Sequence, residues 1–345
     1  MVPRDVLTTV APPISADEAG AAAQRYFGVA GAVRELTSER DRNFHIASPG
    51  GQGYVLKFTN PAEPQVVTSF QTEAMLHLAA RDATLPVPRV LRTLDGETQR
   101  IVEVDGCTMV LRLLTYLEGT PLHATQASPG QMRSLGTTLA RLDLALADFE
   151  HPGSQRDLLW DITRTADIRD RLHYVEDGAR RRMVERFVAR FADEVAPRLP
   201  ALRHQVIHND LNPHNAVLDP VRHETVTGII DFGDALKAPM VNDLATALAY
   251  HVASGETPFG SIVEMTRAYC AVLPLTPEEV DLLPDLVAAR HALTIGITNW
   301  RAAEHPGNRD YILRNAERAF TGLARLTGDE AAAANRLLHH ACQKE

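Results

Sequence analysis

Residues 208–215 read His-Asn-Asp-Leu-Asn-Pro-His-Asn, and residues 231–233 read Asp-Phe-Gly. The first stretch is an H-x-D-x₄-N motif, in which Asp210 can orient a hydroxyl group and accept its proton. The amide oxygen of Asn215 can bind a metal ion, and the carboxylate of Asp231 can supply a second oxygen to the same ion. Phosphoryl transfer from a nucleoside triphosphate requires this set of groups. The two motifs therefore predict a kinase.

Each motif has a simpler explanation when it stands by itself. Residues 208–215 could form a polar surface loop between two strands, and Asp-Phe-Gly alone is only three letters. The simpler explanation is much weaker for the pair, because both motifs follow short apolar stretches typical of strands, at residues 206–207 and 228–230. We expect His208 to be a structural residue that forms hydrogen bonds beneath the loop.

A kinase also needs a lysine for the α- and β-phosphates and a glutamate that pairs with this lysine. Lys57 lies on the third expected strand, residues 53–58, and Glu73 lies near the start of the following helix, residues 71–81. Solvated lysines and glutamates are common at such positions, so neither residue is decisive alone. Because both occur where the kinase pattern requires them, we expect Lys57 and Glu73 to form an ion pair in the nucleotide site.

The segment expected to cover the phosphates, residues 37–42, differs from that of protein kinases because it contains no glycine. We expect Ser38 and backbone N–H groups to bind phosphates there, together with Arg40 or Arg42. The sequence does not distinguish the two arginines. The glycines of residues 50–53 come one hairpin later and are more typical of a turn than of a nucleotide-binding loop.

The remaining pattern predicts an α+β protein. Alternating apolar residues bounded by turn residues indicate strands at residues 32–36, 43–47, 53–58, 98–104 and 108–114. Ser15 and Glu18 have the spacing of a capping box for a helix over residues 15–27. Beyond residue 119 the chain is mostly helical, with helices expected at residues 129–149, 178–197, 242–253, 260–272, 277–300, 310–326 and 329–343.

The composition limits the classes of partner. With 45% hydrophobic and 23% charged residues, the chain is an ordinary globular sequence long enough for two lobes. The net charge of −9 argues against a nucleic-acid or anionic-membrane surface. Cys107, Cys270 and Cys342 have neither metal-ligand spacing nor a disulfide pattern, which fits a reducing cytoplasm. No stretch approaches the roughly 20 apolar residues of a membrane span. We expect a cytoplasmic protein without nucleic-acid or membrane partners.

The motifs resemble the aminoglycoside phosphotransferase and choline kinase superfamily, as do the Ile-Ile-Asp-Phe-Gly-Asp of residues 229–234 and the Asn-Asp-Leu-Ala of residues 242–245. The resemblance covers about residues 18–326. It implies a bilobal protein-kinase-like fold. An N-terminal nucleotide-binding lobe, residues 1–116, would contain an antiparallel sheet with one main helix. A larger, mostly helical lobe, residues 117–345, would bind the acceptor and carry out catalysis. The implied cofactor is Mg²⁺, with ATP or GTP as co-substrate.

The resemblance also implies roles for single residues. The nucleobase would form hydrogen bonds with the backbone of Thr115 and Leu117 at the hinge between the lobes. Asp243 would brace the catalytic loop, and the C-terminal helices would form the acceptor pocket. No activation-loop signature follows Gly233, so a protein substrate is not expected.

Within the superfamily, the chain is most similar to the hydroxylysine kinases in residues 36–44, Asn209 and residues 297–301. This similarity implies phosphorylation of the 5-hydroxyl of hydroxylysine. Homoserine, an amino alcohol and an aminoglycoside stay open as acceptors, although Asn209 replaces a glycine that is common in aminoglycoside enzymes. A non-catalytic pseudokinase that only binds nucleotide is a further alternative, against which the intact catalytic set argues.

Candidate acceptor-binding residues lie in the C-terminal half. Arg301 could bind a substrate carboxylate through two hydrogen bonds, and Trp300 could face a substrate cation. Asp234 could bind a substrate ammonium group, as could Glu304. A packed tryptophan and a surface arginine are equally good explanations for the first two. The expected partner is a small hydroxylated amine or amino acid, bound by a monomer or a homodimer.

Overall fold

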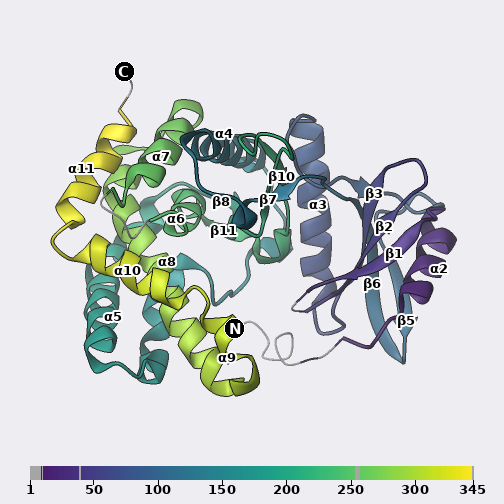
Figure 1. The fold of residues 1–345 in the computed structure, drawn as a ribbon, viewed down its shortest axis with the longest axis horizontal. Helices are drawn as coiled ribbons and strands as arrows, with labels where there is room; N and C mark the ends of the chain where they lie inside the picture. Colours follow the sequence, from purple (N-terminus) through teal and green to yellow (C-terminus); the bar gives the residue numbers. More distant parts are fainter. Residues whose placement is uncertain (1–8, 10, 39, 253–256, 344–345) are drawn as a thin grey trace.

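The computed structural model describes residues 9, 11–38, 40–252 and 257–343, and it has a sheet-rich N-terminal part and a larger helical part (Figure 1). The N-terminal sheet has six strands, paired antiparallel in the order β1-β2-β3-β6-β4, with β5 also paired to β6. The strands are β1 (Ala32–Leu36), β2 (Arg42–Ala47), β3 (Gly53–Phe58), β4 (Val90–Leu91), β5 (Arg100–Val104) and β6 (Cys107–Thr115). The predicted N-terminal antiparallel sheet is confirmed.

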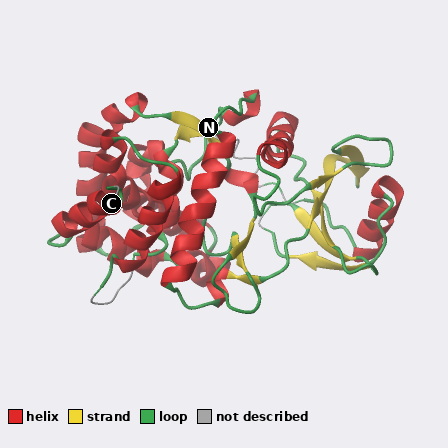
Figure 2. Ribbon diagram, turned by 90° about the horizontal axis from the view of Figure 1, so that it is seen from above, coloured by secondary structure: helices red, strands yellow, loops and turns green. Residues whose placement is uncertain are grey.

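Apolar residues recur along β2 and β3 and give the sheet a buried face, which helix α2 covers. Phe44 and Ile46 of β2 are buried together with Leu56 and Phe58 of β3, in one apolar cluster with helix α2 (Ala16–Phe27). Figure 2 shows α2 on the side of the sheet that faces away from the helical part. The sheet therefore has a small core of its own.

Local signals set the ends of the N-terminal elements. Ser15 and Glu18 form the predicted capping box of α2. The predicted hairpin of β5 and β6 turns at Asp105 and Gly106, whose φ angles are 48° and 73°. Positive φ at both central residues is typical of the tight turns that join antiparallel strands.

Helix α3 (Gln65–Arg81) lies between the sheet and the helical part (Figure 1). It begins earlier than the predicted residue 71, with Pro64 at its N-cap. Phe70, which stands before the predicted start, is already buried within the helix, and Leu78 is buried with it in the large apolar cluster of the helical part. Helix α3 therefore attaches the sheet to the rest of the molecule.

The helical part surrounds the long helix α8, which packs against α6, α9, α10 and the 3₁₀ segment η3 (Ile162–Tyr174). The helices are α4 (Pro129–Leu146), α5 (Gly178–Arg190), α6 (Val241–Ala249), α7 (Gly260–Val272), α8 (Pro277–Glu304), α9 (Arg309–Leu313), α10 (Ala316–Thr327) and α11 (Ala331–Ala341). Residues 286–298 of α8 are all buried, so this helix is the centre of the larger core. The helix predicted over residues 310–326 is instead two helices, α9 and α10.

Two short sheets hold the loop of residues 208–215, the predicted catalytic loop. One pairs β10 (Val226–Ile229), β9 (Ala216–Leu218) and β7 (Thr120–Pro121), and the other pairs β11 (Leu236–Pro239) with β8 (His204–Ile207). The strands next to the motifs were predicted. Strands β7 and β11 were missed because they are short and each contains a proline.

The predicted α+β class is confirmed by the N-terminal antiparallel sheet and the mostly helical remainder. The division into residues 1–116 and 117–345 stays a proposal, supported by the end of β6 at Thr115. Residue 253, the predicted end of the helix that begins near residue 242, lies outside the described residues. None of the helices in the described part of the chain is long and apolar enough to span a membrane.

Candidate active site

The catalytic loop connects β8 to β9, and Asp243 of α6 holds its backbone. The Oδ2 atom of Asp243 accepts the N–H of His208 at 2.8 Å, and its Oδ1 atom accepts the N–H of Asn209 at 2.7 Å. All three residues are buried. A buried N–H without an acceptor costs about 1–3 kcal/mol, so this carboxylate stabilises one conformation of the loop. The geometry agrees with the bracing role expected of Asp243.

His208 forms hydrogen bonds beneath the loop, as expected. Its Nε2 lies 3.1 Å from the backbone oxygen of Ile230, and its Nδ1 lies 3.3 Å from the backbone nitrogen of Asp210. Because the carbonyl oxygen only accepts and the backbone N–H only donates, the proton belongs on Nε2. The ring also meets Phe232 edge-on, with centroids 4.9 Å apart. His208 thus connects the catalytic loop to the Asp-Phe-Gly turn.

Asn209 has a φ angle of 64°, in the left-handed region. Glycine adopts this region freely, and asparagine tolerates it better than most residues. The side chain gains a further contact, since its Nδ2 donates to the backbone oxygen of Asp234 at 3.2 Å. These two facts explain physically how an asparagine can stand at a position where a glycine is common.

Asp210 sits at the centre of a hydrogen-bond network. Arg290 donates to its Oδ1 at 3.1 Å, while Asn212 and Asn215 donate to its Oδ2 at 2.9 and 2.8 Å. Burial raises the pKa of Asp210 to about 7, although Arg290 opposes the shift. A base whose pKa lies near neutrality suits proton acceptance from a hydroxyl group.

Arg290 of α8 is a site residue that sequence reasoning missed. Its guanidinium also donates to the backbone oxygen of Trp160 at 2.8 Å and to the hydroxyl of Tyr250 at 3.2 Å, and it lies 4.9 Å from the centroid of the Trp160 ring. Its side chain is only 2% exposed. The signal was a charged residue inside the mostly apolar stretch of residues 286–297, because such a residue needs a buried partner. Here that partner is Asp210.

Asn215 and Asp231 fit a magnesium site. The Nδ2 of Asn215 donates to the backbone oxygen and Oδ2 of Asp210, which leaves its Oδ1 available. The Oδ1 of Asp231 accepts the N–H of Gly233 at 3.1 Å, which leaves its Oδ2 available. Ile230, next to Asp231, donates its N–H to the Asn215 backbone oxygen at 2.9 Å, so the two candidate ligands are neighbours.

The other ligands of the ion would come from outside the protein. No group of three or more His, Cys, Asp or Glu side chains in the described ranges is arranged to hold a metal. Mg²⁺ usually keeps several waters and is bound by one or two protein carboxylates together with substrate phosphates. Two protein oxygens are therefore an appropriate set.

The predicted Lys57–Glu73 ion pair is not formed, and this expectation needs correction. The Nζ of Lys57 lies 3.6 Å from Oδ2 of Asp41. Glu73 accepts from the Ser69 hydroxyl at 2.9 Å and lies 3.6 Å from His151, with 53% of its side chain exposed. The physical reason is that α3 presents Gln71 and Thr72 to the sheet, where both accept hydrogen bonds from Arg112 of β6, and presents Glu73 to His151 instead. The roles of Lys57 and Glu73 in nucleotide binding stay predictions.

The two arginines of residues 37–42, the predicted phosphate loop, have different surroundings. Arg40 forms an ion pair with Asp234 at 3.2 Å, next to the Asp-Phe-Gly turn. Arg42, at the start of β2, pairs with Glu35 of β1 at 2.8 Å. Ser38 accepts the N–H of Asp41 at 3.2 Å and is exposed. Arg40 is therefore the better candidate for phosphate binding.

Further charged residues join the lobes around Arg40. Arg156 donates to the backbone oxygen of Gly233 at 3.0 Å and lies 3.5 Å from Glu63, which precedes α3. Burial alone would raise the pKa of Asp234, but Arg40, Arg156 and Arg290 together hold it below its usual value. An ammonium group bound to Asp234 would have to compete with Arg40.

The hinge residues are only partly available to a nucleobase. The N–H of Thr115 donates to the backbone oxygen of Arg89 at 2.9 Å, and the Thr115 hydroxyl accepts the N–H of Arg89. In the described part of the chain, the backbone of Leu117 forms no hydrogen bond. Leu117 is thus the stronger candidate of the pair.

Trp300 and Arg301 gain no support as acceptor residues. The guanidinium of Arg171, in η3, lies over the Trp300 ring at 4.8 Å from its centroid, where a substrate cation was expected. Arg301 already interacts within the chain. Both roles stay predictions.

Comparison with known proteins identifies the family. The sequence model of the phosphotransferase enzyme family (APH) matches residues 32–281. The hydroxylysine kinase of Danio rerio is 29% identical over 328 residues, which cover 91% of this chain and 92% of that protein. The homoserine kinase of Methylobacillus glycogenes is 30% identical over 248 residues, which cover 71% of this chain and 72% of that protein.

Solved structures of kinases confirm the predicted kinase-like fold. A microcompartment-associated aminopropanol kinase superposes with a TM-score of 0.70 at 16% identity, over 92% of this chain and 98% of that one. The predicted resemblance is confirmed, and the curated relatives are kinases whose named acceptors carry an alcohol group. The chain belongs to the phosphotransferase enzyme family.

Proposed function

We propose that this protein transfers the γ-phosphate of ATP or GTP to a hydroxyl group of a free amino acid, with 5-hydroxylysine as the leading acceptor. The observation that carries the proposal is the network around Asp210. A half-buried carboxylate of raised pKa is fixed by Arg290 and two asparagines, beside the oxygens of Asn215 and Asp231. That arrangement suits activation of a hydroxyl group facing a metal-bound phosphate.

Different residues act on the acceptor and on the nucleotide. Asp210 accepts the hydrogen bond, and then the proton, of the acceptor hydroxyl. Arg290 keeps the carboxylate pointed towards the site. Asn215 and Asp231 hold Mg²⁺, which when bound neutralises phosphate charge. The protein mainly supplies position and fixed charge, so that little reorganisation is needed during transfer.

The nucleotide would bind between the lobes. Lys57 and Arg40 supply positive charge to the phosphates and exchange their present carboxylate partners, Asp41 and Asp234, for phosphate oxygens. Ser38 and backbone N–H groups of the same loop add hydrogen bonds. The nucleobase would use the backbone of Leu117.

An amino acid is the acceptor best supported by the relatives. The curated relatives compared above are kinases of hydroxylysine and homoserine, and both of these acceptors carry an α-carboxylate and an α-ammonium group. Hydroxylysine ranks first because its kinase is similar over nearly the whole chain. Homoserine is the second candidate, supported by 30% identity over a shorter stretch. The likeness to the aminopropanol kinase, at 16% identity, concerns the fold alone.

The same proposal leads to a cellular location and to a division of the chain into lobes. A kinase that uses cellular nucleotides belongs in the cytoplasm, and the net charge of −9 gives no reason for nucleic-acid binding. We place the nucleotide-binding lobe at residues 1–116 and the acceptor-binding lobe at residues 117–345, in a monomer or a homodimer.

A nucleotide-consumption screen tests the proposed function. Hydroxylysine, homoserine, 1-amino-2-propanol, choline, ethanolamine and kanamycin are each offered with ATP and with GTP. We expect the highest kcat/KM for hydroxylysine. A clear preference for kanamycin or choline would replace the amino-acid assignment, and nucleotide binding without turnover of any acceptor would mark a pseudokinase.

A further inference from the structure

A second carboxyl group lies behind Asp243, in the core of the helical part. Asp143 of α4 is completely buried, and a side-chain hydrogen bond joins it to Asp243 of α6. Its Oδ2 accepts the hydroxyl hydrogen of Tyr269, on α7, at 2.5 Å. Its backbone oxygen accepts from Nε2 of Gln205, on the strand that leads into the catalytic loop, at 2.7 Å. Asp143 therefore connects three packed helices to the base of the catalytic loop.

The two carboxyl groups share one negative charge. Adjacent buried carboxyl groups cannot both be ionised unless a cation compensates them, so one of them holds a proton. Burial, followed by the charge of Asp243, raises the pKa of Asp143 well above its usual value. Arg203 opposes this shift only weakly, and its guanidinium already pairs with Glu279.

The surroundings of the two groups place the proton on Asp143. Both oxygens of Asp243 accept backbone N–H groups, and Asp243 lies in the first turn of α6, where the helix dipole stabilises a negative charge. Asp143 lies in the last turn of α4, where the dipole disfavours a negative charge. Its Oδ1 is buried and accepts from no donor among the described residues. A proton on Asp143 makes it a donor to Asp243.

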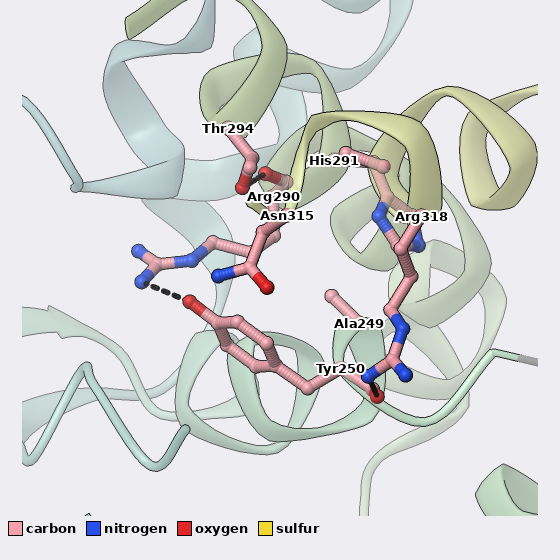
Figure 3. A pocket seen from close by; sticks show the side chains of 8 residues that line it. Ala249, Tyr250, Arg290, His291, Thr294, Asn315 and Arg318 are labelled. Carbon is pink, nitrogen blue, oxygen red and sulfur yellow. Dashed lines mark hydrogen bonds between the residues drawn. The ribbon is translucent and has the colours of Figure 1, made fainter. Parts of the chain in front are cut away.

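The other end of α6 is held as well. Tyr250, at the C-cap of the helix, accepts a hydrogen bond from Nη2 of Arg290 at 3.2 Å, and Figure 3 shows this bond beside the small recess that both residues line. The same nitrogen donates to Oδ1 of Asp210. Helix α6 thus reaches the catalytic loop at both ends, through Asp243 and through Tyr250. Asp143 acts on the first of these ends.

We propose that Asp143 is a positioning residue for phosphoryl transfer: as a neutral carboxylic acid it donates a hydrogen bond to Asp243 and so fixes the carboxylate that holds the catalytic loop. Tyr269 in turn fixes the orientation of Asp143. The proposal rests on the kinase activity and not on the identity of the acceptor. Without Asp143 the Asp243 side chain is free to turn, and Asp210 moves with the loop, while the groups expected to bind nucleotide stay in place.

Two substitutions at Asp143 test the need for a neutral donor. Asparagine can donate to Asp243 and accept from Tyr269, whereas leucine has a similar volume and can do neither. With the acceptor that is turned over fastest, we expect kcat of Asp143→Asn to stay within about threefold of wild type. We expect kcat of Asp143→Leu to fall about 100-fold, the effect of a displaced catalytic group, with KM for nucleotide unchanged.

The opposite results would overturn the proposal. A loss of about 100-fold in Asp143→Asn would show that the position needs a charge. A kcat of Asp143→Leu near that of wild type would show that Asp143 does not position the loop. Tyr269→Phe removes only one hydroxyl group and keeps the test open if Asp143→Leu does not fold. We expect it to lower kcat about fivefold, and an unchanged kcat would overturn the role of Tyr269.

Hydrogen exchange separates a local role from a loss of overall stability. In Asp143→Leu the N–H groups of His208 and Asn209 should exchange at least about tenfold faster than in wild type, while α5 exchanges as before. Thr138→Val replaces another buried polar side chain of α4 and should change neither kcat nor exchange. Faster exchange throughout the helical part, with no excess at the loop, would mark Asp143 as merely structural.

Infrared spectroscopy detects the proton without any turnover. The carbonyl stretch of a carboxylic acid is separate from the bands of a carboxylate, so the spectrum of wild type minus that of Asp143→Asn at pH 7 should contain the band of a buried acid. A carboxylate band instead would overturn the neutral Asp143. Because no acceptor is needed, this result stands even if the proposed acceptor is wrong, and failure of the acceptor screen leaves it intact.

Discussion

The loop that carries Asp210 and the loop that carries Arg40 face the same site from opposite lobes, but they are held differently. The catalytic loop is fixed by buried groups of its own lobe, chiefly Asp243 beneath its backbone and Arg290 against its carboxylate. The phosphate loop is held by partly exposed ion pairs, one of which, between Arg40 and Asp234, crosses between the lobes.

This difference suggests that the two loops have different roles in the reaction. A buried carboxylate that accepts two buried N–H groups keeps one geometry, so the side of the site that activates the hydroxyl is organised before any substrate binds. The Arg40–Asp234 and Lys57–Asp41 pairs keep part of their side chains exposed, so phosphate oxygens can reach the cations and replace the carboxylates. The phosphate side is thus able to reorganise when nucleotide enters.

The largest effect is expected at the base itself. Asp210→Ala should lower kcat by about 1,000-fold, because a positioned general base contributes roughly 100- to 10,000-fold. Nucleotide affinity should change little, since Asp210 serves the acceptor. Steady-state kinetics and nucleotide titration measure the two quantities separately. Unchanged turnover would remove Asp210 from the mechanism.

The second-largest effect is expected for Asp243, whose removal should lower the free energy of unfolding. Asp243→Ala leaves the N–H groups of His208 and Asn209 buried without acceptors, at about 1–3 kcal/mol each, and should reduce kcat as well. Urea unfolding measures the loss. The matched control is Asp219→Ala, which removes a carboxylate that accepts four backbone N–H groups at the surface. Equal losses in the two variants would contradict the importance of burial.

Acid should lower the free energy of unfolding through the buried His291, on the same helix as Arg290. His291, next to Arg290 on α8, is 3% exposed, and its pKa in the folded protein is about 3, against 6.5 for a free histidine. Below pH 6.5 the unfolded chain binds a proton that the folded chain refuses, so stability falls as pH falls towards 3. At pH 5 the loss is about 2 kcal/mol.

Urea midpoints at pH 7 and pH 5 measure this effect. In His291→Gln the starting stability is lower, but its loss between the two pH values should shrink by about 2 kcal/mol. The same loss in the variant as in wild type would show that other groups dominate the acid response.

The phosphate side should respond in binding rather than stability. Arg40→Met should raise the KM for nucleotide about tenfold, the effect of one charge-assisted contact, with a small change in melting temperature. Arg42→Met, which loses a similar ion pair with Glu35 outside the site, should leave KM unchanged. The opposite pattern would assign the phosphate role to Arg42.

The smallest effect is expected at Glu73. Because Glu73 is half-exposed and does not pair with Lys57, Glu73→Gln should change kcat/KM less than about threefold, the range of exposed ion pairs. Lys57→Met provides the comparison, with a larger rise in nucleotide KM. A fall of 100-fold or more in Glu73→Gln would show that the pair forms once nucleotide is bound.

Local patterns were enough to predict much of the fold. The strands around Lys57 and the Asp105-Gly106 hairpin follow from alternation and turn chemistry, which act between near neighbours in sequence. The start of α3 was placed too late because residues 65–70 include two valines and a threonine, which are weak helix formers. Burial of this segment against the helical part decides its structure.

The site was predictable only where its residues are close in sequence. Asp210 and Asn215 lie on one loop, and Asp231 lies on the turn after the next hairpin. The spacing of the three residues along the chain was therefore enough to predict them. Arg290 reaches Asp210 from 80 positions away, and no local pattern encodes that contact. The prediction of a Lys57–Glu73 ion pair was wrong for the same reason, because the direction of the Glu73 side chain depends on how α3 packs.

The identity of the phosphorylated product decides whether this protein phosphorylates hydroxylysine through Asp210. Wild-type enzyme, Mg²⁺, ATP and 5-hydroxylysine are incubated, and the product is examined by phosphorus NMR with proton coupling. We predict one phosphomonoester whose phosphorus couples to the single proton on carbon 5, and no such product from the Asp210→Ala variant. Release of inorganic phosphate alone, or the same phosphomonoester from the variant at the wild-type rate, would contradict it.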